Sequence, residues 1–232
     1  METENTINIG DTDKGHHNHA ELKLNIGCGS TVANGWVNID RSLNIYLSRI
    51  PRIKQLLFLL HLIPEEVYRA KWNRTYLRLN VERGLPFDSC SVDYIYSSHL
   101  LEHLSRSKAK FLLMECFRVL KPKGVLRLAV PDLSVHVSKY IRMKNPDGEE
   151  YDDRAADIFM EELGVQKELP LLLRVFGKGN QHLWMYDSSS LTSILSEIGF
   201  GSSKQMSFRD GNVPDLESIE FRENSLFVES SK

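Results

Sequence analysis

Short apolar runs recur along the chain, and each ends at a polar residue, a glycine or a proline, a pattern that predicts β-strands. The first run, Leu22–Ile26, ends at Gly27, and the second, Trp36–Ile39, ends at Asp40. Further runs cover residues 76–80, 92–97, 125–130, 203–208 and 225–230. The pattern therefore predicts seven strands.

Apolar residues at helical spacing separate several of these runs. One predicted helix covers residues 109–120 and ends before Pro122, which cannot continue it. Another covers residues 191–198, and we expect Ser188–Ser190 to supply its N-cap and Gly199 to end it. Strands and helices thus alternate along most of the chain.

This alternation is typical of an α/β, Rossmann-like fold, in which helices flank both faces of a mostly parallel sheet. We expect a single domain over residues 21–232 and a polar, disordered tail over residues 1–20. Two segments interrupt the pattern and are interpreted as inserts. Residues 43–76 are helical with a break at Pro64, and residues 132–186 are irregular.

In such sheets, ligands bind beyond the carboxyl ends of the strands, where the strand order reverses. Several distinctive residues stand at predicted strand ends. They are Gly27, Asp40, Asn80, Ser97 and Pro131. The sequence therefore predicts a ligand site at this edge of the sheet.

Composition and charge narrow the classes of protein. The formal net charge is −2 over 232 residues, so no broad basic field favours nucleic acid as a partner. Cys28, Cys90 and Cys116 are too far apart for a disulfide framework or a metal pair, which favours a cytoplasmic location. The longest apolar run, Leu56–Ile63, is too short for a transmembrane segment. Residues 53–63 could form a helix that packs on the core, a lid helix, or a helix that faces lipid.

The glycine turn "LNIGCGS" indicates what kind of ligand fits this edge. A dinucleotide site has a third glycine in G-x-G-x-x-G and an acid about 20 residues further on. Here Val32 takes the third place and Asp40 comes too early. Residues 30–35 are too few for a full helix whose N-terminus could face a pyrophosphate. A ligand with ribose hydroxyls and without phosphates fits better, because an acid on the next strand can bind both hydroxyls.

Beyond this turn, several segments in order resemble the class I S-adenosylmethionine-dependent methyltransferases, in particular the group called methyltransferase type 11. They are "LNIGCGS", "GWVNID", "LPFDSCSVDYIYSSHLLEHL", "ECFRVLKPKGVLRLAVPDL" and "HLWMYDSSSLTSILSEIGF", from about Leu22 to Phe200. The resemblance implies a seven-stranded sheet with an antiparallel last strand, and S-adenosyl-L-methionine as the cofactor. The chain departs from the family at Thr31, which replaces a third glycine, and in a first helix that is nearly absent.

The resemblance also implies a set of cofactor contacts. They are Asn25, Gly27, Cys28 and Gly29 at the methionine end, Asp40 at the ribose hydroxyls, Asn80 and the Val81 backbone at the adenine, and the Ser97 carbonyl at the amino group. Asn80 replaces the usual aspartate, which keeps an acceptor oxygen and loses the charge. Simpler interpretations stay open: the glycines could form only a tight turn, Cys28 could be a nucleophile, Asp40 could cap a helix, and Asn80 could be a turn residue.

The segment "HLLEH" supplies the candidate catalytic residues. On a helix, His99, Glu102 and His103 are spaced i, i+3 and i+4 and therefore share one face. His99 could be the base that removes a proton from an acceptor hydroxyl, and Glu102 and His103 could orient loops through hydrogen bonds. Some related methyltransferases hold a divalent cation with a similar E-x-x-E-H set, but His99 replaces the first glutamate, and we expect no resident metal.

The acceptor pocket is expected from the inserts. His182, Trp184 and Tyr186 alternate near the end of the second insert and could either present one face to the acceptor or pack internally. A further charged group could contact a charged or sugar-like acceptor or belong to a solvated loop. It comprises Arg209, Asp210, Glu220 and Arg222.

We therefore expect a cytoplasmic S-adenosylmethionine-dependent methyltransferase that acts on an oxygen or nitrogen of a small-molecule acceptor. A sugar, a glycolipid precursor or a secondary metabolite would suit the resemblance. Two alternatives stay open: a methyltransferase for a peptide, a protein or RNA, and a non-catalytic module that binds the cofactor. The sequence does not specify an oligomeric state.

Overall fold

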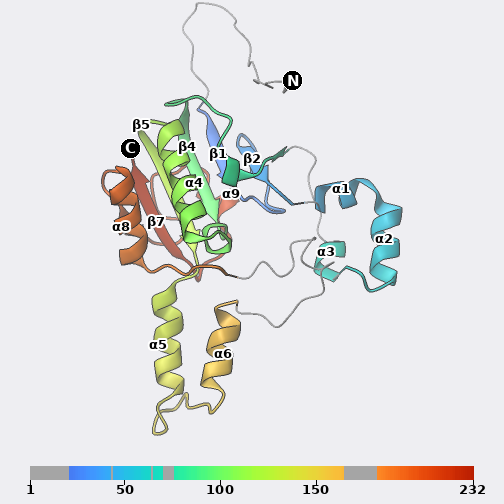
Figure 1. The fold of residues 1–232 in the computed structure, drawn as a ribbon, viewed down its shortest axis with the longest axis vertical. Coiled ribbons are helices and arrows are strands. Elements are labelled where there is room, and N and C mark those ends of the chain that lie inside the picture. The colour runs from blue at the N-terminus through green and yellow to red at the C-terminus, as the bar shows by residue number, and fades with distance from the viewer. Residues whose placement is uncertain (1–20, 43, 64, 70–75, 165–181) are drawn as a thin grey trace, which may run out of the picture.

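Among the residues that the computed structural model describes, seven strands form one sheet (Figure 1). The described residues are 21–42, 44–63, 65–69, 76–164 and 182–232. The strands are β1 (Lys23–Ile26), β2 (Val37–Asp40), β3 (Leu77–Arg78), β4 (Val92–Ser98), β5 (Leu120–Val130), β6 (Lys204–Met206) and β7 (Leu226–Ser231). Their order across the sheet is β3-β2-β1-β4-β5-β7-β6.

The strand directions confirm the predicted fold class. Neighbouring strands from β3 to β5 run parallel, whereas β7 runs antiparallel to both β5 and β6. The order reverses between β1 and β4, which is where ligands bind in folds of this kind. The connection from β1 to β2, residues 27–36, makes turns and no helix, as the sequence predicts.

Apolar side chains pack on both faces of the sheet. Ile95 of β4 lies in a cluster with α4 (Arg106–Val119) and α8 (Ser188–Ile198), and Figure 1 shows these two helices beside each other. The next residue, Tyr96, belongs to a second cluster with α9 (Leu216–Ile219). Successive side chains of a strand point to opposite faces, so helices cover the sheet on both sides.

The start of α8 differs from the prediction. Asp187, and not the serines at 188–190, is the N-cap: its Oδ1 accepts a hydrogen bond from the Ser190 backbone at 2.7 Å. The Asp187 backbone donates in return to Oγ of Ser190 at 3.1 Å. A carboxylate is also favoured here by the helix dipole. The predicted end at Gly199 is confirmed by its left-handed backbone, with φ at 110°.

The first insert, residues 43–76, is helical where it is described. Its helices are α1 (Asn44–Arg49), α2 (Pro51–Leu59) and α3 (Glu65–Arg69). The rings of Phe58 and Tyr68 stack with centroids 4.3 Å apart and so join α2 to α3. Pro64 lies outside the described residues. No described helix is long and apolar enough to cross a membrane, and the choice between a lid and a lipid-facing role for residues 53–63 stays open.

The second insert, residues 132–186, is more regular than predicted. It contains α5 (Leu133–Met143) and α6 (Ala155–Glu162). These helices extend side by side from the sheet (Figure 1), with the rings of Tyr140 and Phe159 5.0 Å apart. Asp132 caps α5 by accepting a backbone hydrogen bond from its first turn at 2.9 Å, a start signal that the prediction of an irregular segment overlooked. Residues 165–181 lie outside the described part of the chain.

A buried ion network connects β5 and β7 to the segment after α9. Nε of Arg127 lies 2.8 Å from Oε1 of Glu220, and Nη1 of Arg127 lies 3.0 Å from Oε1 of Glu229. Arg127 and Glu220 have no exposed surface. Glu220 is therefore neither a solvated loop residue nor an acceptor ligand, and both interpretations of it are wrong because a buried arginine takes its charge.

Candidate functional site

The glycine loop after β1 is held against β2 by its backbone. The amides of Gly27 and Cys28 donate to the carbonyl oxygen of Ile39 at 2.8 and 3.1 Å. Gly27 has a φ of 72°, and a Cβ there would lie 3.0 Å from Cβ of Leu100. Gly29 also has a positive φ, 55°, but a Cβ there would meet no atom within 4 Å. The loop therefore needs both glycines, and it leaves open space beside Gly29 that a ligand can approach.

Asn25, a predicted cofactor contact, lies beneath this loop. Its buried Nδ2 donates to Oδ1 of Asn38 at 3.0 Å and to the carbonyl of Thr31 at 3.2 Å. Asn38 is directly opposite Asn25 in the register of β1 and β2 and also bonds the backbone of Ala33. The pair shapes the loop from within. Asn38 was not among the predicted residues, although a polar residue inside each of two adjacent apolar strands is a usable signal.

Cys28 and Asp40 meet at the open side of the loop. Burial, and then the charge of Asp40, raise the pKa of Cys28 to about 12, so its thiol stays protonated at neutral pH and is no nucleophile. Oδ2 of Asp40 accepts a hydrogen bond from the Gly29 amide at 2.9 Å, and Oδ1 accepts one from the Ser42 amide at 2.6 Å. These bonds fix the carboxylate at the end of β2, where the prediction places the ribose hydroxyls.

On the other side of β2, Asn80 and Val81 follow β3. Asn80 caps the short 3-10 turn η1 (Val81–Arg83), because its Oδ1 accepts a hydrogen bond from the Glu82 amide at 3.2 Å. Asn80 is therefore a turn residue, as one interpretation held. An amide oxygen has a second lone pair, so its contact to adenine stays a prediction, as does that of the Val81 backbone.

Ser97 marks the end of β4, where it stands opposite Ile26 in the register with β1. Its Oγ is buried and has no hydrogen-bond partner among the described residues. Buried polar atoms are nearly always paired, so this hydroxyl fits a polar ligand. The open space at Gly29, the fixed carboxylate of Asp40 and the unpaired Ser97 hydroxyl lie at the ends of β1, β2 and β4. They fit a cofactor that has a ribose and an amino-acid end. Two hollows on the described surface lie elsewhere, one beside β6 and β7 and one along α8.

The predicted helix at "HLLEH" is absent, and the prediction of a shared helical face is wrong. His99 has a left-handed backbone, with φ at 50°, and its amide still bonds the Ala129 carbonyl at 2.8 Å. Only a 3-10 turn, η2 (Leu101–His103), follows. The side chains nevertheless converge: Nδ1 of His99 lies 3.1 Å and Nε2 of His103 lies 4.0 Å from Oε1 of Glu102.

Glu102 is the centre of this group and has no exposed surface. Neither of its carboxylate oxygens makes a hydrogen bond with a described residue, although His99 is close enough for an ion pair. Nε2 of His99 in turn lies 2.9 Å from Oγ of Ser225, just before β7. The carboxylate of Glu102, the imidazole of His99 and the hydroxyl of Ser225 therefore form a chain of contacts that starts at the buried turn.

The predicted acceptor residues reach this group from the end of the second insert. The amides of Leu183 and Trp184 donate to the backbone carbonyl of Glu102 at 2.6 and 3.2 Å. The ring of His182 lies 5.1 Å from that of His103. Burial lowers the pKa of His182, and the charge of Glu102 partly opposes this. The backbone therefore docks the insert directly onto η2.

Trp184 and Tyr186 have different surroundings. Arg106, at the start of α4, lies 5.0 Å from the Trp184 ring, which is 40% exposed. Tyr186 is buried, its hydroxyl has no hydrogen-bond partner among the described residues, and burial raises its pKa to about 12. A parallel bridge to Asp132 places Tyr186 beside the end of β5. The neutral Tyr186 hydroxyl is therefore another polar atom available to a ligand.

Among the comparisons with known proteins, one family model matches part of the chain. Residues 24–128, somewhat less than half of the chain, match a family model described as a methyltransferase domain. The match includes the glycine loop, Asp40 and "HLLEH", and it ends before the second insert. This match agrees with the prediction of a class I S-adenosylmethionine-dependent methyltransferase that uses S-adenosyl-L-methionine as its cofactor. No curated protein matches the sequence.

Several solved structures are similar over most of the chain. An S-adenosylmethionine-dependent methyltransferase from Archaeoglobus fulgidus has 15% identity and a TM-score of 0.49, with 92% of this chain and 87% of that chain covered. A possible histamine N-methyltransferase from Thermotoga maritima has 16% identity and a TM-score of 0.46, with 91% and 82% covered. A methyltransferase from Methanosarcina mazei has 18% identity and a TM-score of 0.45, with 91% and 92% covered.

Proposed function

We propose that this protein transfers a methyl group from S-adenosylmethionine to an oxygen or nitrogen of a small molecule, with His99 as the base. The observation that carries the proposal is the Glu102–His99 pair. Leu100 follows His99 directly in the sequence, and its side chain packs against Gly27 of the glycine loop. The base is therefore adjacent to the loop that would hold the methionine end.

The bound cofactor supplies an electrophilic methyl group on its sulfonium, so the hard part of the chemistry is its own. The protein must align the acceptor and take its proton. With the proton of His99 on Nδ1, which lies 3.1 Å from Oε1 of Glu102, the lone pair of Nε2 faces the place that Oγ of Ser225 occupies in this structure. An acceptor hydroxyl in that place would give its proton to Nε2, and the carboxylate of Glu102 would stabilise the imidazolium that forms.

Two features support a small, polar acceptor. The buried hydroxyl of Tyr186 lacks a hydrogen-bond partner among the described residues and would recover one from a polar acceptor. The net charge of −2 provides no general attraction for RNA. A sugar, a glycolipid precursor or a secondary metabolite has the oxygen or nitrogen atoms that this arrangement can activate.

The proposal is tested by incubating the protein with S-adenosylmethionine labelled in its methyl group and with separate cell fractions of metabolites, proteins and RNA. We expect label in the metabolite fraction and little elsewhere. Label only in the protein or RNA fraction would contradict a small-molecule acceptor. Cofactor binding without transfer to any fraction would contradict catalysis and favour a binding module.

A further inference from the structure

We infer that Glu102, His103 and His182 form a binding site for a divalent transition-metal ion, with Zn²⁺ as the best fit. The ion would join η2 to the end of the second insert. The inference goes beyond the proposed methyl transfer and departs from the expectation of no resident metal. Compared with the predicted group, it replaces His99 with His182, which stands 83 positions further along the chain.

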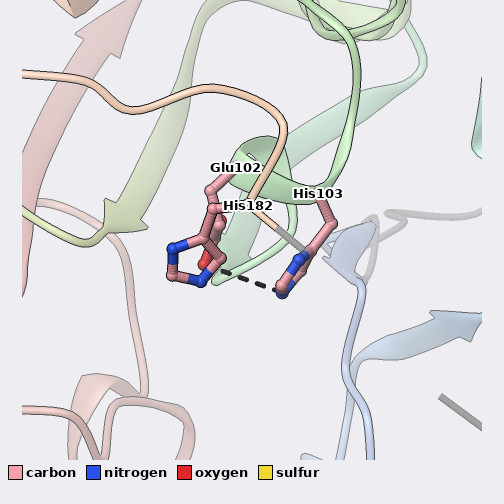
Figure 2. A group of neighbouring side chains, drawn as sticks. All are labelled: Glu102, His103 and His182. Carbon is pink, nitrogen blue, oxygen red and sulfur yellow. Dashed lines mark ion pairs between the residues drawn. The ribbon is translucent and has the colours of Figure 1, made fainter. Parts of the chain in front are cut away.

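The geometry of the three side chains carries the inference. One potential ligand atom from each residue lies within 4.8 Å of those of the other two, and Nε2 of His103 is 4.0 Å from Oε1 of Glu102. Figure 2 shows the three side chains close together: Glu102 and His182 overlap in this view, and a dashed line joins Glu102 to His103. Ligand atoms around a tetrahedral zinc ion are about 3.3 Å apart. Closure by roughly 1.5 Å or less would therefore complete the site.

The electrostatics of Glu102 give independent support. The residue has no exposed surface, and neither carboxylate oxygen has a hydrogen-bond partner among the described residues. Nδ1 of His182 is likewise buried without such a partner. A buried carboxylate needs a compensating charge. His99 can compensate Oε1 from 3.1 Å, but this leaves Oε2 without a partner among the described residues, whereas a dication between the three residues accounts for it.

The donor set selects the ion. Two imidazoles and one carboxylate suit zinc and neighbouring transition metals, whereas magnesium and calcium favour sites made of oxygen atoms. Three protein ligands leave a fourth position open for water or another oxygen ligand. His99, in contact with the carboxylate, would orient it from outside the ligand set, as the neighbours of metal ligands commonly do.

The consequence concerns the second insert. Its end is already docked by the backbone bonds of Leu183 and Trp184 to the Glu102 carbonyl. An ion held by side chains from both segments would lock this contact and fix the position of Tyr186 nearby. Metal binding would thus order the part of the chain that is expected to meet the acceptor.

The test is a titration of the full-length chain with ZnCl₂, followed by calorimetry, and with CoCl₂, followed by the visible absorption of bound Co²⁺. His16, His17 and His19 are first replaced by glutamine, because the histidines near the N-terminus could bind metal themselves. We expect one ion per chain in this background. Glu102→Gln and His182→Ala should each weaken binding by more than about 100-fold, and His99→Ala by about 10-fold.

Two controls separate a metal site from a structural cluster. His136→Ala changes a histidine of α5 that pairs with Glu162 of α6 in the second insert, and it should leave zinc binding unchanged. His182→Cys should retain zinc binding, since a thiolate is a good zinc ligand. S-adenosylmethionine binding should be retained in His182→Ala. Retained binding would show that the variant still folds and that its loss of zinc binding is not a loss of structure. No bound ion in the background protein, or binding in Glu102→Gln and His182→Ala that is as tight as in the background protein, would overturn the inference.

Discussion

Nδ1 of His99 lies 3.1 Å from Oε1 of Glu102, a carboxylate with no exposed surface at the carboxyl end of the central strands. The two side chains are in contact although residues 99–103 do not form the helix that was expected to bring them together. A left-handed residue followed by a 3-10 turn brings the two side chains together instead. A buried carboxylate this close to an imidazole fixes the orientation of the ring.

Removing the imidazole tests its role as a base. His99→Ala should lower turnover by roughly 10²–10⁴-fold and leave cofactor affinity nearly unchanged, because the residue would act on the acceptor. The loss should shrink at high pH, where an acceptor hydroxyl ionises without help. Steady-state rates across pH, with His136→Ala as the matched control, measure this. Full turnover with an unchanged pH profile would remove His99 from the catalytic residues.

Asp40 provides the test of cofactor binding. Asp40→Ala should weaken S-adenosylmethionine binding by about 1–3 kcal/mol, because the ribose hydroxyls lose a charged partner. Asp40→Asn retains an acceptor oxygen and should fall between this variant and the wild type. Calorimetry measures both, with Asp147→Ala at an exposed position as the control. Wild-type affinity in Asp40→Ala would contradict the ribose assignment.

The two loop glycines should respond differently to alanine. Gly29→Ala meets no neighbouring atom and carries only the backbone cost of a positive φ, about 1–2 kcal/mol. Gly27→Ala adds a Cβ 3.0 Å from Leu100 and should destabilise the protein further. Denaturant unfolding compares them. Equal free energies of unfolding for the two variants would show that Leu100 moves freely, against the packing described for it.

The buried ion network makes a prediction about stability alone. Arg127→Met should destabilise the protein by about 3–5 kcal/mol, because it leaves the charges of Glu220 and Glu229 buried and unpaired. Arg142→Met breaks an exposed ion pair with Glu150 and should cost less than about 1 kcal/mol. Thermal and urea unfolding give the comparison. Similar costs for both variants would contradict the buried network.

Thiol reactivity reports on the inside of the glycine loop. The pKa of Cys28 is raised to about 12, so the thiolate that alkylating agents attack is scarce until the pH approaches that value. Cys90 is exposed. Iodoacetamide at pH 8 should therefore modify Cys90 in the folded protein and Cys28 only after unfolding. Mass spectrometry of peptides measures both. Rapid labelling of Cys28 in the folded chain would contradict its burial.

The sequence predicts the sheet well because the strand ends carry local signals. The apolar runs that end at Gly27 and Asp40 and the stop at Gly199 are properties of a few adjacent residues. The prediction fails where contacts distant along the chain decide. Asn38 shapes the loop because the strand register places it opposite Asn25. Glu220 can be buried because it pairs with Arg127, which stands 93 residues earlier in the chain. His182 meets Glu102 only through the docking of the second insert, which no periodicity indicates.

The most direct test of the central claim is a ¹³C NMR spectrum of the product formed from S-adenosylmethionine labelled in its methyl carbon. The protein is incubated with a metabolite extract, with Asp40→Ala as the control that lacks the ribose contact. We expect a sharp signal from a small molecule, at a chemical shift typical of a methyl group on oxygen or nitrogen, and a much weaker one for Asp40→Ala. A methyl group on carbon or sulfur, or no transfer while the cofactor stays bound, would contradict this claim.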